Sequence, residues 1–278
     1  MKIAHPRTLD EAFEALQRMP GAQLLAGGTD FVVEVNFGHR RPPAVVGLRR
    51  VAELQGWRRD DGELVLGAAL TFTEIETQLA GELPALAAAA RTVGSPQMRN
   101  AGTLGGNLGT ASPAGDSLPV LAAMDARVVL ASQAGERTLP MTEFVTGVKK
   151  TAIQPREVIR EVRVPRLRGP QQFLKVGTRN AMVISIACAA LVVDLDGRSV
   201  RCGLGSVAPT PVRAAEAEAF IAGEIDWDGP HAAAGAVARF GELAAAAASP
   251  ITDHRSTAEY RRRAVQVICT RALTRSLA

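Results

Sequence analysis

The chain has 278 residues and a formal net charge of +4, and 47% of its residues are hydrophobic although only 4% are aromatic. This length supports two or three domains, with cores built mainly from Leu, Val, Ile and Ala. The basic residues are dispersed, which argues against nucleic-acid binding. The N-terminus lacks an apolar signal segment and no stretch reaches membrane-spanning length, so we expect a cytoplasmic protein without a membrane span.

The first 60 or so residues predict a small α/β lobe. Its predicted elements are, in chain order, a helix over 8–19, a strand at 23–26, a helix from 31 and a buried strand at 45–48. The first helix opens with the capping-box pattern Thr8-Leu-Asp-Glu11 and carries its apolar residues on one face. The strand at 23–26 leads directly into a pair of glycines.

A second, larger lobe is predicted from about residue 61 to residue 168. Its predicted elements are a strand at 64–68, helices at 73–80 and 84–93, a glycine-rich loop at 102–109, a helix at 119–124, and strands at 127–131 and 157–164. Proline and glycine then interrupt the pattern at 165–170, as is typical of a domain linker.

Residues 169–278 predict a C-terminal domain with an antiparallel sheet and helices. The apolar stretches 187–195 and 199–207 flank Asp196-Gly197, a strong hairpin signal. Three helices are predicted after it, at about 214–222, 231–247 and 256–277, the last with a capping box of Ser256 and Glu259.

Two glycine-rich stretches carry the clearest chemical signal, Leu25-Ala-Gly-Gly-Thr-Asp30 and Gly102-Thr-Leu-Gly-Gly-Asn-Leu-Gly109. Glycine lets a ligand approach the backbone closely, and successive amides in a turn bind anions. Either stretch alone is equally typical of a simple turn. Neither fits G-x-G-x-x-G, and no P-loop motif occurs, so a Rossmann fold and a P-loop NTPase lack support. Together, the two stretches predict a site for the diphosphate of a nucleotide cofactor.

No other pattern predicts catalysis or metal binding. The three cysteines form no C-x-x-C pair, which excludes the usual zinc and iron–sulfur signatures. The four histidines are far apart, and no serine lies in a G-x-S-x-G context. We therefore assign no catalytic residue and no metal ligand to this chain.

The stretch from Gly94 to Pro119 resembles the second FAD-binding segment of the flavoprotein (medium) subunits of molybdenum hydroxylases, the xanthine dehydrogenase and carbon monoxide dehydrogenase relatives. The first glycine stretch resembles the first FAD segment of the same subunits. Similar segments follow in the same order at 173–179, 207–213 and 256–262. The resemblance implies an α+β fold, with a two-lobed FAD-binding domain of the PCMH/vanillyl-alcohol-oxidase type followed by an antiparallel sheet with helices.

The resemblance also implies a set of noncovalent FAD-binding residues. They are Leu24, Leu25, Ala26, Gly27, Gly28, Thr29, Asp30 and Phe31 on one side of the pyrophosphate, and Thr103, Gly105, Gly106 and Asn107 on the other, with Val93, Asp116, Ile159 and Lys175 near the rings. Turn-capping by Asp116, surface exposure of Lys175 and simple core packing of the two apolar residues are the alternatives. Some relatives carry an aromatic residue at Val93 and an acid near Ala181-Met182, where this chain is apolar.

The implied function is that of an FAD-binding electron-transfer subunit in a multi-subunit oxidoreductase, most like bacterial xanthine dehydrogenase. A molybdopterin-binding large subunit and a [2Fe–2S] small subunit are the implied partners, in a dimer of heterotrimers, with NAD or another electron acceptor. Molybdopterin and [2Fe–2S] are expected only in those partners. A self-contained FAD-dependent oxidase or reductase of the same fold, and an adaptor without flavin, are the rival hypotheses.

Overall fold

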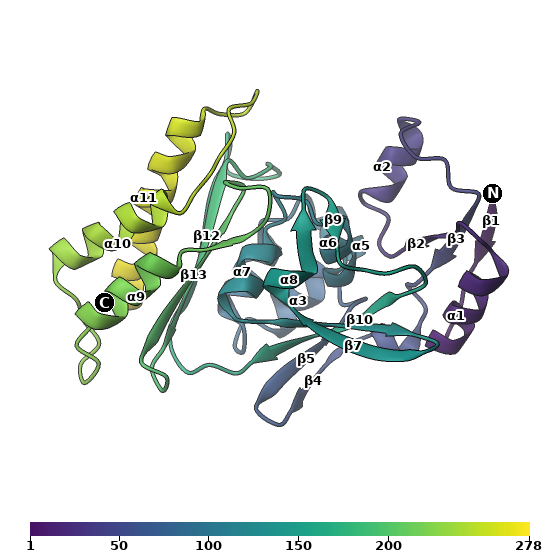
Figure 1. The fold of residues 1–278 in the computed structure, drawn as a ribbon, viewed down its shortest axis with the longest axis horizontal. Helices are drawn as coiled ribbons and strands as arrows, with labels where there is room; N and C mark the ends of the chain where they lie inside the picture. Colours follow the sequence, from purple (N-terminus) through teal and green to yellow (C-terminus); the bar gives the residue numbers. More distant parts are fainter.

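The computed structural model describes residues 1–278 and has three parts along its longest axis (Figure 1). A small lobe holds the N-terminus at one end, a central lobe follows, and a sheet covered by helices forms the other end, near the C-terminus. None of the helices combines the length and the apolar character needed to cross a bilayer.

The small lobe contains a parallel sheet with strand order β1-β3-β2. Its elements are β1 (Lys2–Ala4), α1 (Leu9–Arg18), β2 (Gln23–Leu25), α2 (Phe31–Asn36) and β3 (Ala44–Gly47). Thr8 caps α1, because its hydroxyl accepts the Glu11 N–H at 3.2 Å, but the Glu11 carboxylate accepts from the Arg7 N–H instead of closing the predicted box. The strands are parallel, so the loop after β2 and the segment after β3 emerge at the same sheet edge.

The central lobe is an antiparallel five-stranded sheet, order β4-β5-β10-β6-β7, with helices packed against it. The strands are β4 (Trp57–Asp60), β5 (Glu63–Gly67), β6 (Arg127–Ser132), β7 (Gly135–Pro140) and β10 (Val158–Pro165). The other elements are η1 (Ala52–Leu54), α3 (Phe72–Gln78), α4 (Pro84–Arg91), α5 (Pro96–Ala101), α6 (Leu104–Thr110), α7 (Ser117–Ala123), α8 (Met141–Phe144), β8 (Val145–Gly147) and β9 (Lys150–Thr151).

The predicted glycine loop at 102–109 is wrong, since helix α6 occupies most of this stretch. Gly105 and Gly106 have no left-handed backbone angles. Gly105 serves close packing instead, because a Cβ there would lie 2.7 Å from both the Cβ and the carbonyl oxygen of Ala68. In sequence, a glycine pair is typical of a turn. Here the helix needs glycine at residue 105 because it packs against Ala68, the residue that follows β5.

The C-terminal domain is an antiparallel sheet, order β11-β12-β13-β14, with α9, α10 and α11 on its outer face (Figure 1). The bounds are β11 (Gln171–Val176), β12 (Ala187–Asp194), β13 (Ser199–Gly205), β14 (Val212–Arg213), α9 (Ala215–Glu224), α10 (Ala234–Ala246) and α11 (Ala258–Ser276). Strand β12 is buried along its whole length. Leu191 and Val193 belong to the core under the outer helices, while Ala190 and Val192 belong to the core of the central lobe. Because successive side chains of β12 point to opposite faces of the sheet, this one strand contributes residues to both cores.

Two local predictions in this domain need correction. The hairpin exists, but Asp194 pairs with Ser199, so its loop has four residues, and the positive φ of 45° falls on Arg198 rather than on Gly197. Helix α11 is capped by Thr257, whose hydroxyl accepts the Tyr260 N–H at 3.2 Å, and not by Ser256.

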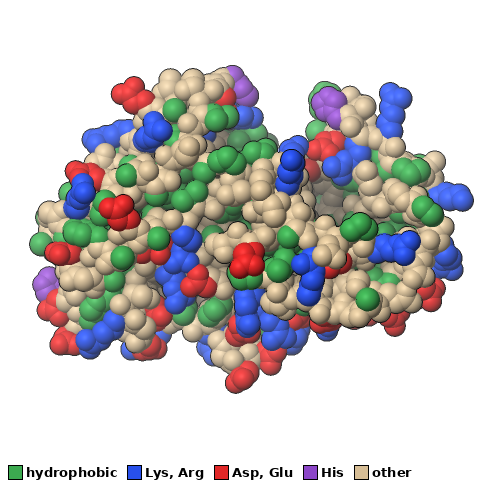
Figure 2. Space-filling model, in the orientation of Figure 1, with side chains coloured by type: hydrophobic (Ala, Val, Ile, Leu, Met, Phe, Trp, Pro, Cys, Tyr) green, Lys and Arg blue, Asp and Glu red, His purple; other side chains and the backbone are tan.

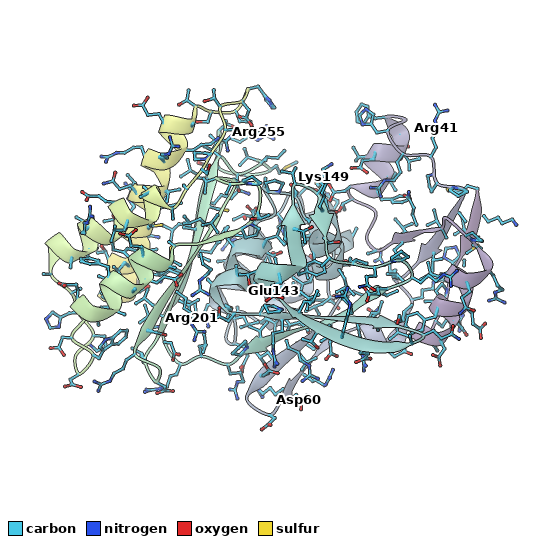
Figure 3. All side chains as sticks on the ribbon, in the orientation of Figure 1. Arg41, Asp60, Glu143, Lys149, Arg201 and Arg255 are labelled. Carbon is cyan, nitrogen blue, oxygen red and sulfur yellow. The ribbon has the colours of Figure 1, made fainter.

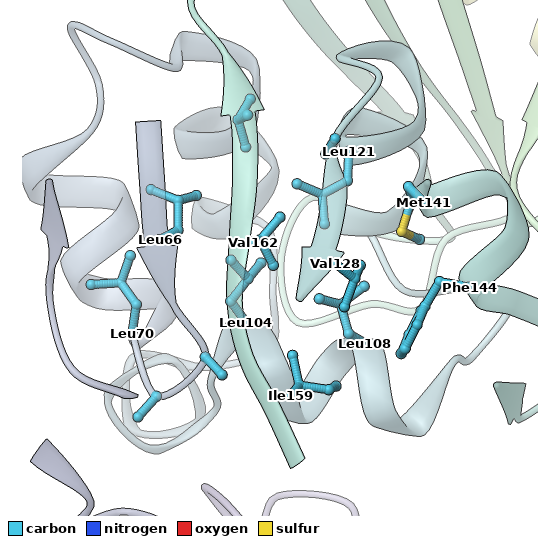
Figure 4. Close-up of a cluster of buried hydrophobic side chains, with 14 of the residues drawn as sticks. Leu66, Leu70, Leu104, Leu108, Leu121, Val128, Met141, Phe144, Ile159 and Val162 are labelled. Carbon is cyan, nitrogen blue, oxygen red and sulfur yellow. The ribbon is translucent and has the colours of Figure 1, made fainter. Parts of the chain in front are cut away.

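The core of the central lobe is built from aliphatic side chains of both the sheet and the helices (Figure 4). Leu104 and Leu108 of α6 are fully buried there, and Val162 of β10 lies among them. One face of α6 is thus fixed in the core, and this leaves the opposite face for contacts with the small lobe.

An ion pair joins α11 to the loop that precedes it and predicts a pH dependence of stability. Buried Arg261 donates to Asp253 Oδ1 at 2.7 Å and to the Ile186 carbonyl at 2.7 Å. The Arg255 N–H and Arg261 lower the pKa of Asp253 from 3.8 to about 2. A carboxylate with a depressed pKa stabilises the fold above its unfolded pKa and loses that contribution as pH falls through its folded pKa.

The free energy of unfolding of wild type should therefore exceed that of Asp253→Asn at neutral pH, and the difference should shrink between pH 3.8 and about 2. Urea unfolding of both proteins over this range measures it. A difference that stays constant with pH would contradict this role of the carboxylate.

Candidate cofactor site

A cleft of about 570 Å³ lies between the small lobe and α6, and Figure 2 shows the surface notched there. This volume is typical of cofactor sites. The predicted site residues that line it are Leu24, Ala26, Gly27, Gly28, Thr29, Asp30, Phe31, Val93, Thr103, Gly105, Gly106, Asn107, Asp116 and Ile159. Of the predicted set, Leu25 and Lys175 are not in the wall. The structure thus gathers two sequence-distant motifs around one cavity.

The loop from Ala26 to Asp30 lines this cleft and contains free amides. None of its backbone N–H groups donates a hydrogen bond within the protein. Leu25 ends the preceding strand, where its carbonyl accepts the Leu48 N–H at 2.7 Å, and Gly28 has a left-handed φ of 79°. Unpaired backbone donors normally find a partner, so this row of amides is suited to an anionic ligand.

The loop also touches the second motif directly. A Cβ on Gly27 would lie 1.8 Å from the carbonyl oxygen of Ala101, and one on Gly106 would lie 3.5 Å from the Cβ of Ala26. At residue 27 only glycine allows the two lobes to approach this closely, whereas the contact at Gly106 is an ordinary van der Waals distance. Gly27 therefore sets the width of the cleft.

The α6 side offers fewer amides than the sequence predicts. The N–H groups of Leu104 and Gly105 donate to the carbonyls of Leu70 and Ala68, at 2.9 and 2.8 Å. The Gly106 N–H donates to the Thr103 hydroxyl at 3.0 Å. The two motifs are therefore not equivalent: the first supplies amides, and the second supplies the side chains of Thr103 and Asn107 on a fixed helix.

One end of the cleft holds a buried ion pair. Lys175 of β11 donates to Asp116 Oδ2 at 2.6 Å, and the side chains are only 9% and 5% exposed. Thr92 donates to the same oxygen at 3.1 Å, and Ser185 donates to the other oxygen. Burial raises the pKa of Asp116, although Lys175, Ser185 and Thr92 act to lower it. Lys175 does not line the cleft, and it acts there only through its ion pair with Asp116, which does line it.

Two apolar regions lie apart along the cleft. Val93 follows Thr92 and lies near the Asp116 end, together with the exposed side chains of Met182 and Ile184. Ile159 lies beside the last turn of α6, since its Cδ1 would be 3.9 Å from a Cβ on Gly109. A polar middle between two apolar regions fits a dinucleotide whose diphosphate joins two ring systems.

Charged side chains from segments without any motif also line the cleft, near the C-terminal end of α6. Glu34 of α2 accepts from Lys149 at 2.9 Å and from Arg40 at 2.8 Å, and its pKa is lowered chiefly by the Lys149 hydrogen bond. Lys149 lies at the border of the central lobe toward α2 (Figure 3). These residues were not predicted as site residues, since isolated charges in surface segments carry no local signal in the sequence.

Comparison with known families and proteins agrees with this geometry. Residues 1–167 match the FAD binding domain in molybdopterin dehydrogenase, and residues 172–276 match the CO dehydrogenase flavoprotein C-terminal domain. The nicotinate dehydrogenase FAD-subunit of Eubacterium barkeri is 36% identical over 205 residues, covering 70% of this chain and 69% of that protein. The xanthine dehydrogenase FAD-binding subunit of Escherichia coli O157:H7 is 35% identical over 224 residues, covering 76% and 75%.

Solved structures show the same fold. A chain of the carbon monoxide dehydrogenase of Hydrogenophaga pseudoflava superposes with a TM-score of 0.90 at 29% identity, covering 99% of this chain and 96% of that one. The fold is thus the α+β arrangement expected, a two-lobed FAD-binding domain of the PCMH type followed by a sheet domain, and the cofactor is FAD. The chain belongs to the FAD-binding subunits of the molybdenum hydroxylase family, as part of an oxidoreductase.

Proposed function

We propose that this chain is the electron-transfer subunit of a xanthine dehydrogenase-like complex in the cytoplasm. Its partners are a molybdopterin-binding large subunit and a [2Fe–2S] small subunit, arranged as a dimer of heterotrimers. Bound FAD would supply the electron-transfer chemistry between the [2Fe–2S] clusters of a partner and NAD or another acceptor. We also propose that the FAD-binding domain comprises residues 1–168 and the C-terminal domain residues 169–278.

The row of unpaired amides from Ala26 to Asp30 carries this proposal. In it, these N–H groups bind one side of the pyrophosphate, while the side chains of Thr103 and Asn107 bind the other, and the Gly106 N–H orients the Thr103 hydroxyl. Oriented amides need no long side chain to be immobilised, so they bind a diphosphate at low entropic cost. Gly105 acts by keeping α6 close to Ala68.

The Asp116 end of the cleft supports electron transfer rather than substrate chemistry. Both oxygens of Asp116 already accept hydrogen bonds from Lys175, Thr92 and Ser185. Three of the roughly four acceptor positions of this carboxylate are thus occupied within the protein, which leaves it poorly placed to accept a substrate proton. In our proposal this pair shapes the cavity next to one ring of FAD, together with Val93, and Ile159 contacts the other ring.

Anaerobic reduction of the bound flavin by substrate tests the function. We expect purines or aldehydes to bleach the flavin absorption only when the molybdenum and iron–sulfur subunits are present. The isolated chain with bound FAD should remain yellow with the same substrates. Bleaching of the isolated chain at a catalytic rate would favour the self-contained flavoenzyme instead.

A further inference from the structure

The two lobes are bridged across the cleft at the end of α6 by an ion pair and a hydrogen bond. Lys149 Nζ lies 2.9 Å from Glu34 Oε1, and Thr110 donates to Asp30 Oδ2 at 3.3 Å. Asp30, Glu34, Thr110 and Lys149 all line the cleft. Both contacts join α2, or the residue before it, to the central lobe.

The lysine is held in place by its own backbone. The Lys149 N–H donates to the carbonyl of Ala111 at 3.0 Å, and Ala111 is the left-handed C-cap of α6. The bridge therefore stands at the C-terminal end of α6, whereas Thr103 and Gly106 stand at its N-terminal end. Seven residues at about 1.5 Å each separate these ends by about 10 Å.

The formal charges at this bridge sum to zero, because Arg40 and Lys149 are matched by the carboxylates of Glu34 and Asp30. Arg40 and Lys149 both pair with Glu34, at distances of 2.8 and 2.9 Å. A lysine already paired in this way supplies little net attraction for a phosphate. Its position across the cleft points to a mechanical role, which is to hold α2 against the central lobe.

The two ends of the cleft expose different kinds of side chain, charged at the Lys149 end and apolar at the Asp116 end. At the Asp116 end, Met98, Met182 and Ile184 are 43%, 54% and 50% exposed. A ring that exchanges electrons with another protein needs such an open end. The other ring system of a dinucleotide, the adenine, then lies beside Ile159 at the end that Glu34 and Lys149 bridge.

We propose that Glu34 and Lys149 form a clasp that closes over the adenosine half of FAD and slows its dissociation. The clasp rests on the proposed function only in requiring that FAD occupies this cleft. Opening it separates α2 from the end of α6, so the adenosine leaves only after the ion pair breaks. The flavin half is retained by other groups.

Stopped-flow release of FAD tests the clasp. In Lys149→Met and in Glu34→Gln, the FAD dissociation rate should rise about two- to fivefold, the range expected for a partly exposed ion pair. The double variant should be no faster than Glu34→Gln, because Glu34→Gln alone already removes the Glu34–Lys149 ion pair. Lys150→Met, which alters the exposed neighbouring lysine, is the matched control and should release FAD at the wild-type rate.

Competition by ADP locates the clasp along the cofactor. ADP should displace FAD from wild type, and its affinity should fall by the same factor as that of FAD in Lys149→Met. Additive single effects, unchanged FAD release, or ADP that does not compete or is unaffected by Lys149→Met would each overturn the proposal. Failure of the wild-type chain to bind any FAD would instead overturn the proposed function.

Discussion

Gly27→Ala should weaken FAD binding roughly a hundredfold. A Cβ at residue 27 would lie 1.8 Å from the Ala101 carbonyl oxygen and 2.5 Å from its carbon, so the loop must move away from the central lobe. Such a movement takes the amides of the loop off the pyrophosphate, and one hydrogen bond to a charged group contributes about 1.5–3 kcal/mol. Overpacking also destabilises a fold by about 1–3 kcal/mol.

Fluorescence titration of the flavin-free variant with FAD measures the loss of affinity. Thermal unfolding without FAD measures the loss of stability. Gly81→Ala is the matched control, because no atom lies within 4 Å of a Cβ at that glycine. It should bind FAD as wild type does. Wild-type affinity in Gly27→Ala would show that the closeness of the two lobes is not needed for binding.

Lys175→Met should destabilise the chain by about 3–5 kcal/mol, since it leaves the buried carboxylate of Asp116 without its countercharge. The double variant with Asp116→Asn should be less destabilised than Lys175→Met alone, because no buried charge remains. Urea unfolding of wild type, both single variants and the double variant gives the comparison.

The pH dependence supplies a second readout of this ion pair. Without the lysine, burial is opposed only by the hydrogen bonds from Ser185 and Thr92, so the pKa of Asp116 rises further and the variant folds best with this carboxyl protonated. A group whose folded pKa is raised contributes stability at low pH and loses it as pH rises. The loss of unfolding free energy in Lys175→Met, relative to wild type, should therefore become smaller as the pH is lowered. An equal loss of unfolding free energy in Lys175→Met and in the double variant with Asp116→Asn would show that Lys175 acts only by packing.

The first glycine stretch was predictable from sequence because its chemistry is local. A strand, two glycines and a helix start lie within about ten residues, and the free amides follow from the turn that Gly28 makes. The role of Gly105 was not predictable in the same way. It depends on a contact with Ala68, which lies on a different segment of the chain. The local sequence of α6 alone therefore predicts a loop.

The edge strands and the clasp were likewise not predictable from the local sequence. Strands β4 and β7 are rich in exposed charged and polar residues, so they lack the apolar alternation that marks a strand. Glu34 and Lys149 are separated by 115 positions, and nothing in either segment indicates the other. Only the packing of the small lobe against α6 brings these two residues together.

Titration of the flavin-free chain with FAD, followed by acid precipitation, measures most directly whether the cleft holds the cofactor. We predict that one FAD binds per chain and that it remains entirely in the supernatant after precipitation, because the amides of residues 26–30 bind it without a covalent bond. No saturable binding, or flavin that stays on the precipitated polypeptide, would contradict this prediction.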